Sequence, residues 1–94
     1  RIIMYLEIIS PEAILFSGEV KSVSVPGTNG YFQMLNNHAP IVSSLKKGTV
    51  TIEGNLEITT EFKSKFEQKE GKTILQIKSG TVEMNNNKLI LLSD

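Results

Sequence analysis

The residues of this chain that could carry out chemistry are few and widely spaced. His38 is the only histidine and cysteine is absent, which excludes thiolate metal sites, multi-histidine metal sites and cysteine nucleophiles. A hydrolytic triad around His38 would need a serine and an orienting carboxylate. Ser10, Ser43 and Ser44 are available by spacing alone, and no G-x-S-x-G motif is present. We therefore expect His38 to have a structural or interface role, and we predict no catalytic residue, metal or cofactor.

The acidic residues and the glycine-rich segment also lack the arrangement of a site. Asp94 is the single aspartate, and Glu53, Glu57 and Glu61 recur every four residues. On a strand such spacing does not bring carboxylates together, and it is typical of a solvated sheet edge. The G-T-N-G segment at 27–30 is not followed by the Lys-Ser or Lys-Thr pair of a phosphate-binding loop. We interpret this segment as a turn between strands.

Length and charge exclude several classes of protein. The chain has 94 residues and a mass of 10.4 kDa, which predicts one domain over residues 1–94. Ten basic and ten acidic side chains cancel, whereas nucleic-acid binding requires a basic face. The longest uninterrupted apolar run covers residues 2–6, far fewer than the roughly 20 that span a bilayer. We therefore expect neither a nucleic-acid partner nor a transmembrane segment.

The elements that would position these residues are strands. Ile, Val and Thr are abundant, Ala is rare, and no segment shows the apolar spacing of a capped helix. Short alternating segments, separated by turns rich in Gly, Asn and Pro, predict about ten strands. The expected fold is all-β, an antiparallel β-sandwich or flattened barrel. Residues 89–92 are apolar at every position, which predicts a central strand.

The least regular pattern lies in a charged, extended hairpin predicted at about residues 53–72. Apolar or small side chains occupy every second position from Leu56 to Phe66, mostly separated by charged ones. This period of two predicts a half-solvated antiparallel strand. A helix is the alternative, because Ile58, Phe62 and Phe66 are also four residues apart. Phe62 and Phe66 either fold over the sandwich or meet a partner, and the sequence leaves both possibilities open.

From the residues alone, a binding or structural module is favoured over an enzyme. One candidate is a small β-sandwich module that binds peptide or carbohydrate, although the absence of tryptophan weakens its carbohydrate version. The other is an enzyme built around His38, for which no partner residues are visible.

Three blocks of sequence carry a family resemblance. F-S-G-E-V at 16–20, V-S-V-P-G-T-N-G at 23–30 and N-H-A-P at 37–40 strongly resemble the epsilon subunit of F-type ATP synthases. The resemblance implies the N-terminal β-sandwich domain, in a short form that lacks the C-terminal helical hairpin. It implies a non-catalytic rotor subunit that docks the gamma subunit onto the c-ring and couples proton flow to ATP synthesis. The expected location is peripheral, on the cytoplasmic face of the bacterial inner membrane.

The resemblance also implies which residues meet the partners. The c-ring would be faced by Gly27, Thr28, Asn29, Gly30 and Tyr31, and the interface with gamma or the c-ring would include Ser10, His38, Ala39, Pro40 and Ser43. The family usually has Gly at the position of Gln33 and Pro at those of Asn36 and Lys47. Its hairpin equivalent to residues 53–72 is usually shorter, which leaves the role of that hairpin open.

Overall fold

The computed structural model describes residues 4–94, which form ten β-strands and one short 3₁₀ helix, η1. The elements are β1 (Met4–Ile9), β2 (Ile14–Val20), β3 (Ser22–Gly27), β4 (Gly30–Leu35), β5 (Ile41–Leu45), β6 (Gly48–Glu53), η1 (Thr60–Lys65), β7 (Phe66–Lys69), β8 (Lys72–Ile77), β9 (Gly80–Asn85) and β10 (Lys88–Ser93). The predicted all-β fold of about ten strands is confirmed. The prediction of one domain over residues 1–94 extends to residues 1–3, which lie outside the described part, and stays a prediction.

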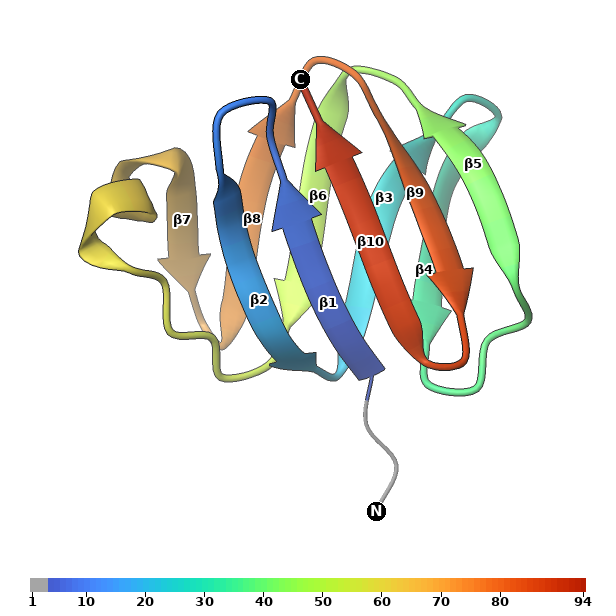
Figure 1. Cartoon of the computed structure of the whole chain (residues 1–94), viewed down its shortest axis with the longest axis horizontal. Helices are drawn as coiled ribbons and strands as arrows, with labels where there is room; N and C mark the ends of the chain where they lie inside the picture. Colours follow the sequence, from blue (N-terminus) through green and yellow to red (C-terminus); the bar gives the residue numbers. More distant parts are fainter. Residues whose placement is uncertain (1–3) are drawn as a thin grey trace.

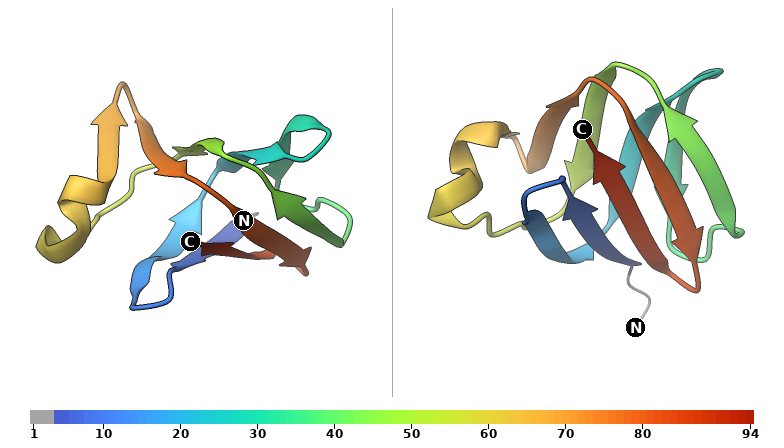
Figure 2. Two further views of the ribbon diagram at one scale, coloured as in Figure 1. Left: turned by 90° about the horizontal axis from the view of Figure 1, so that it is seen from above. Right: turned by 45° about the horizontal axis from the view of Figure 1, so that its top comes forward.

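The strands form one sheet that curls into two layers (Figures 1 and 2). Its order is β2-β1-β10-β9-β5-β3-β6-β8-β7, and β4 pairs with β3 off this path. A single bridge between Gly27 and Leu45 joins β3 to β5. Figure 2 (left) shows that the layers meet near β5 and separate toward the two edge strands, β2 and β7. The sheet therefore resembles a sandwich that is closed on one side and open on the other.

One strand pair departs from the predicted antiparallel pattern. β1 and β10 run parallel, with Leu6 beside Leu89 and Ile8 beside Leu91, so the prediction is wrong at this pair. Each of the two strands has its hairpin partner, β2 or β9, on its other edge. The parallel pair is the seam where the two hairpins meet, and β10 lies centrally in this layer as predicted.

The core lies between the two layers. Met4, Leu6 and Ile8 of β1 are fully buried, as are Val50 and Ile52 of β6 in the other layer. These side chains alternate with more exposed ones along β1 and β6, so the period of two in the sequence directs one face of each of these strands inward. Burial of each such aliphatic side chain contributes about 1.5–3 kcal/mol. The two layers therefore form one packed block.

Positive-φ residues mark the tight turns. The predicted hairpin between β3 and β4 is present, with Thr28 and Asn29 at its tip and Gly30 at φ 124°. The β9–β10 turn contains Asn86 at φ 52° and Asn87 at φ 60°. Asparagine tolerates this left-handed backbone better than most residues because its side chain bonds locally. The Asn-rich segments thus turn the chain, as the sequence predicts.

The predicted strand from Leu56 to Phe66 is wrong. After β6 ends at Glu53, residues 54–59 have no strand pairing, η1 follows, and pairing resumes only at Phe66. Residues 54–65, hereafter the bridging segment, cross between the open edges of the two layers, as Figure 1 shows. Leu56 and Ile58 are buried, which accounts for the period of two at these positions.

Two aromatic side chains follow Leu56 and Ile58. Phe62 of η1 and Phe66, the first residue of β7, are half-buried and pack against the core. Of the two possibilities that the sequence leaves open for these rings, the structure shows the first: both pack onto the sandwich. The Gln68 side-chain amide also donates to the Leu56 carbonyl oxygen, at 3.1 Å. Side-chain burial and this bond, rather than a strand ladder, hold the segment.

Candidate functional site

The β3–β4 turn contains the predicted c-ring-facing residues. Thr28 and Asn29 are exposed, whereas Gly27 is buried. A Cβ atom at Gly27 would lie 2.9 Å from the Gly30 carbonyl oxygen and 2.8 Å from the Phe32 ring, so the close approach of the two strands requires glycine there. A shallow hollow of about 290 Å³ is lined by residues 27–32 and Ser43. The structure therefore brings the predicted c-ring-facing residues and Ser43 together.

Tyr31 is held in place while most of its surface is open. Its side chain is 57% exposed, and its hydroxyl oxygen accepts the Thr49 N–H at 2.9 Å. Gly48 provides the room, because a Cβ atom there would lie 2.6 Å from that oxygen. An aromatic ring that is already fixed loses little entropy when a partner covers it. Tyr31 is thus suited to an interface.

Removal of the Tyr31 hydroxyl should leave the Thr49 backbone N–H without its hydrogen-bond acceptor. We expect Tyr31→Phe to increase hydrogen exchange at the Thr49 amide and to cost about 0.5–1.5 kcal/mol, because one hydrogen bond is lost. Exchange measured residue by residue in both proteins tests this. Tyr5→Phe is the matched control, since the Tyr5 hydroxyl bonds the Ser17 hydroxyl instead. Unchanged exchange at Thr49 in Tyr31→Phe would contradict the assigned contact.

The His38 loop lies at the other end of β4. Its backbone is fixed by Asn37, whose N–H donates to the Asn87 side-chain oxygen of the β9–β10 turn. The Asn87 amide donates back to the Asn37 side-chain oxygen, at 3.3 Å. His38 Nδ1 lies 2.7 Å from the Ala39 carbonyl oxygen, a local contact that orients the ring without any carboxylate or serine. No feature of this contact is typical of a general base.

The predicted interface residues therefore do not form one patch. Figure 1 shows the β3–β4 turn at the end of the molecule where the chain's C-terminus lies, and the β4–β5 connection at the opposite end. Residues 38–40 belong to that connection. Ser10 lies in the β1–β2 turn and lines a separate hollow of about 470 Å³ with Lys47, Lys78 and Asp94. Which of these surfaces meets which partner stays a prediction.

Asp94 ties the last strand to the β8–β9 turn. Its carboxylate accepts the backbone N–H of Lys78 at 3.0 Å and that of Ser79 at 3.3 Å. These bonds, the Lys78 bond first, hold the pKa of Asp94 below its usual value. Because the pKa is lowered in the folded state, the ionised carboxylate stabilises the fold above its unfolded pKa. That stabilisation is lost as the pH falls through the lower, folded value.

Asp94→Asn should therefore make the free energy of unfolding depend less on pH under acidic conditions. We expect the wild-type protein to lose more free energy of unfolding than the variant as the pH falls below about 4, the region of the unfolded pKa. Urea unfolding at a series of pH values measures this difference. Glu12→Gln, which removes an exposed carboxylate from the neighbouring β1–β2 turn, is the control. The same acid dependence in wild type and Asp94→Asn would refute the role given to this carboxylate.

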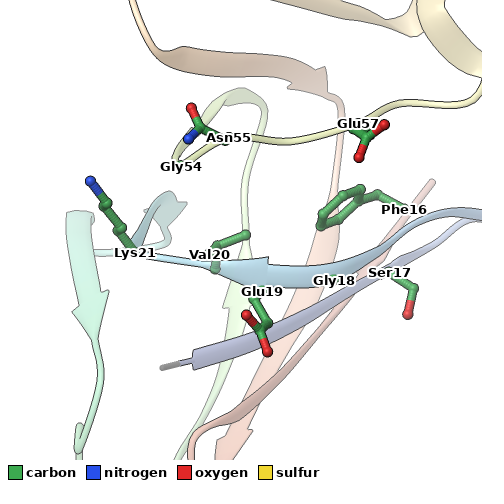
Figure 3. Close-up of a pocket in the computed structure, with 9 residues that line it drawn as sticks. All are labelled: Phe16, Ser17, Gly18, Glu19, Val20, Lys21, Gly54, Asn55 and Glu57. Atoms are coloured by element: carbon green, nitrogen blue, oxygen red, sulfur yellow. The ribbon is translucent and has the colours of Figure 1, made fainter. Parts of the chain in front are cut away.

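One hollow was not predicted from the sequence. It measures about 460 Å³ and lies between the open edge of β2 and residues 54–57 of the bridging segment (Figure 3). The Phe16 ring lies over Gly18, where a Cβ atom would be 2.9 Å from the ring. This contact gives the F-S-G block a structural reason, since the ring needs glycine beneath it. Only the pairing of β2 as an edge strand could have indicated the hollow, and that pairing is not visible in the sequence.

The described residues show no metal site and no membrane-crossing helix. Within residues 4–94, no three His, Cys, Asp or Glu side chains are grouped so as to hold a metal ion. In the same part of the chain, no helix has the length and apolar character needed to cross a bilayer.

The fold is that of a two-layered β module, and the sequence comparisons give its family. Residues 3–94 match the family described as ATP synthase, Delta/Epsilon chain, beta-sandwich domain. The ATP synthase epsilon chain of Chlorobaculum tepidum is 38% identical over 89 residues, which cover 95% of this chain and 86% of that relative. The epsilon chain of Leptospira interrogans is 39% identical, and the match spans 59% of its length. The chain belongs to this family of ATP synthase subunits.

Two solved structures share the fold at low sequence identity. A chain of the Euglena gracilis mitochondrial ATP synthase, OSCP/F1/c-ring, matches with a TM-score of 0.74 at 16% identity, over 99% of this chain and 51% of that one. A chain of the Tetrahymena thermophila mitochondrial ATP synthase central stalk/c-ring matches with a TM-score of 0.65 at 14% identity, over 96% and 62%. This chain therefore spans about half to two thirds of those chains. Family membership confirms the prediction of a non-catalytic ATP synthase subunit rather than a separate enzyme.

Proposed function

We propose that this chain is a rotor subunit of the central stalk, which docks the gamma subunit onto the c-ring and couples proton flow to ATP synthesis. The observation that carries the proposal is the family match, which extends over residues 3–94. The complex would hold the chain at the cytoplasmic face of the bacterial inner membrane, where the c-ring exposes its loops. Catalysis would reside in other subunits.

The packed core supports a mechanical role. A subunit between two rotor parts must pass torque from one face to another without deforming. Protein interiors are close-packed and of low compressibility, and this core extends without a break between the layers, from Met4 and Leu89 on one side to Val25 and Ile52 on the other. The block therefore moves as a unit, provided that its two contact surfaces resist shear.

The separation of the predicted surfaces suits a subunit with two partners. Residues 27–31 would meet the c-ring, where open space around Gly30 allows close approach and Tyr31 adds contact area. His38, Ala39 and Pro40 lie at the opposite end of β4, where the gamma subunit would be in reach. Ser10 and Ser43 complete the predicted interface.

Co-purification tests the proposal directly. The tagged chain would be expressed together with the gamma and c subunits of the same organism, and the complexes would be isolated under mild detergent. Recovery of both subunits in fixed ratio supports the rotor role. Recovery of neither, together with binding to an immobilised peptide or glycan, would establish the alternative of a small β-sandwich binding module.

A further inference from the structure

The end of the molecule that carries the β3–β4 turn is basic. The strand register brings the β3–β4, β5–β6 and β8–β9 turns together there, because Gly27 pairs with Leu45 and Leu45 pairs with Gly80. Figure 1 shows the β1–β2 turn and the C-terminus at the same end. The charged residues of these turns, of the C-terminus and of the hollow that Ser10 lines are Glu12, Lys46, Lys47, Lys65, Lys78 and Asp94. Four lysines thus face two carboxylates, although the whole chain has no net charge.

Three of these lysines line the hollow of about 470 Å³, hereafter the lysine hollow. Lys47 directly precedes β6, Lys65 ends η1 and Lys78 directly follows β8, so three separate elements bring them together. All three side chains are exposed and open to a ligand. Of the two carboxylates in the lining, that of Asp94 already accepts the backbone N–H groups of Lys78 and Ser79. The lysine hollow therefore favours an anion.

Buried apolar side chains also line the lysine hollow. They are Leu15 of β2, with 4% of its surface exposed, and Leu75 and Ile77 of β8, each with 5% exposed. All three belong to the core, at the side where β2 and β8 lie in separate layers. A hollow of this size, with apolar lining and a few charged groups, is typical of a small-molecule site. The ligand that matches both parts is an amphiphilic anion.

We propose that the lysine hollow binds an anionic phospholipid, with the lipid phosphate among Lys47, Lys65 and Lys78 and its apolar part against the buried side chains. The inference rests on the proposed function, which directs this end toward the c-ring and hence toward the bilayer that holds the ring. Anionic lipids of the cytoplasmic leaflet attract lysines close to the membrane surface. A free phosphate would use the lysines and leave Leu15 and Leu75 without a contact.

Titration of the purified chain with soluble short-chain phosphatidylglycerol, followed by NMR of the side-chain methyl groups, tests the site. We expect the methyl signals of Leu15, Leu75 and Ile77 to shift and to saturate. Glycerol phosphate, which has the same phosphate and no acyl chain, should leave them in place. Equal shifts with glycerol phosphate would identify a free phosphate as the ligand and overturn the lipid assignment. Unshifted signals with the lipid would overturn the site itself.

Vesicle binding tests the part played by the lysines. Lys47→Gln, Lys65→Gln and Lys78→Gln, combined in one variant, should weaken binding to vesicles of phosphatidylglycerol and phosphatidylcholine about 100-fold, because each lysine contributes about fivefold. Vesicles of phosphatidylcholine alone should bind neither this variant nor wild type. Equal binding of wild type to both kinds of vesicle would contradict the requirement for an anionic lipid.

The matched control removes the same charge at the opposite end of the molecule. It combines Lys21→Gln, Lys69→Gln and Lys88→Gln, all at exposed positions, where β2 and β7 end and β10 begins (Figure 1). This variant should bind like wild type, because physiological salt screens charges beyond about 8 Å. Equal weakening by the two triple variants would mean a response to net charge, and the lysine hollow would not be the site.

The readouts separate this inference from the proposed function. If the chain co-purifies with the gamma and c subunits but binds no anionic lipid, the inference is overturned and the rotor role stands. If it binds the lipid but neither subunit, the rotor role is overturned and the lipid site stands. Circular dichroism of both triple variants must match that of wild type, and the methyl titration, which uses wild type alone, tests the site without them.

Discussion

Gly80→Ala is expected to lower the free energy of unfolding by about 3 kcal/mol or more, an overpacking effect at the upper end of the usual range. A Cβ atom at Gly80 would lie 2.3 Å from the Leu92 carbonyl oxygen. That oxygen belongs to the backbone, so no side-chain rotation relieves the clash. Gly80 also pairs with Leu45 of β5 and Ser93 of β10, so separation of the strands would disturb both neighbours of β9.

A loss of this size is a large part of the stability of a small domain, which is about 5–15 kcal/mol. Urea unfolding followed by circular dichroism measures it. Gly71→Asn is the matched control: Gly71 has φ 77°, a Cβ atom there would meet no other atom within 4 Å, and asparagine tolerates that backbone. We expect the control to stay within about 1 kcal/mol of wild type. An unfolding midpoint for Gly80→Ala equal to that of the control would refute the packing described for β9.

The second large effect is expected at the β3–β4 turn. Thr28→Arg combined with Asn29→Arg should weaken binding to the c-ring about 100-fold, equivalent to about 3 kcal/mol. Both residues are exposed at the tip of the turn, so the variant should fold normally. Two charged side chains would then lose their water in the interface without gaining partners, which is costly.

Binding to c-rings in detergent, with gamma present, measures this effect. The control places two arginines elsewhere on the surface, by Glu61→Arg and Ser64→Arg in η1, where both residues are exposed. Figure 1 shows η1 on the opposite side of the molecule from the β3–β4 turn. If the two double variants bind the c-ring equally well, residues 27–31 are not part of the c-ring interface.

Local patterns were sufficient to predict most of the fold. The alternation around Val23 and Val25 and the turn before Gly30 correspond to the β3–β4 hairpin, and the Asn-rich turn at 85–87 joins β9 to β10. These features depend on residues close together in the sequence. The parallel pairing of β1 with β10 joins segments about 80 residues apart, and no local pattern encodes it.

Between Leu56 and Phe66 the apolar side chains follow two overlapping spacings. Leu56 and Ile58 follow a period of two, while Phe62 and Phe66 follow a period of four. The period of two holds in the extended stretch before η1, whereas Phe62 lies in η1 and Phe66 begins β7, so the spacing of four marks no continuous helix. The sequence could not mark the change, since both halves bury their apolar side chains against the same core.

The surfaces could be predicted only in part. The residue types of the β3–β4 turn indicate an exposed hairpin tip, and Thr28 and Asn29 are exposed. The sequence did not reveal that the His38 loop is bonded to the β9–β10 turn through Asn37 and Asn87, because that contact depends on the pairing of distant strands. Residues 89–92 correctly indicate a central strand, but Leu92 is exposed. An exposed apolar residue has the same sequence signature as one in the core.

ATP-driven proton pumping tests the central claim most directly. Inverted membrane vesicles would be prepared from the source organism after removal of its own copy of this subunit, and the purified protein would be added back. We predict that the protein restores proton uptake per ATP hydrolysed, while Thr28→Arg with Asn29→Arg does not. If wild-type protein rebinds to the vesicles and pumping stays uncoupled from hydrolysis, the chain does not link gamma to the c-ring.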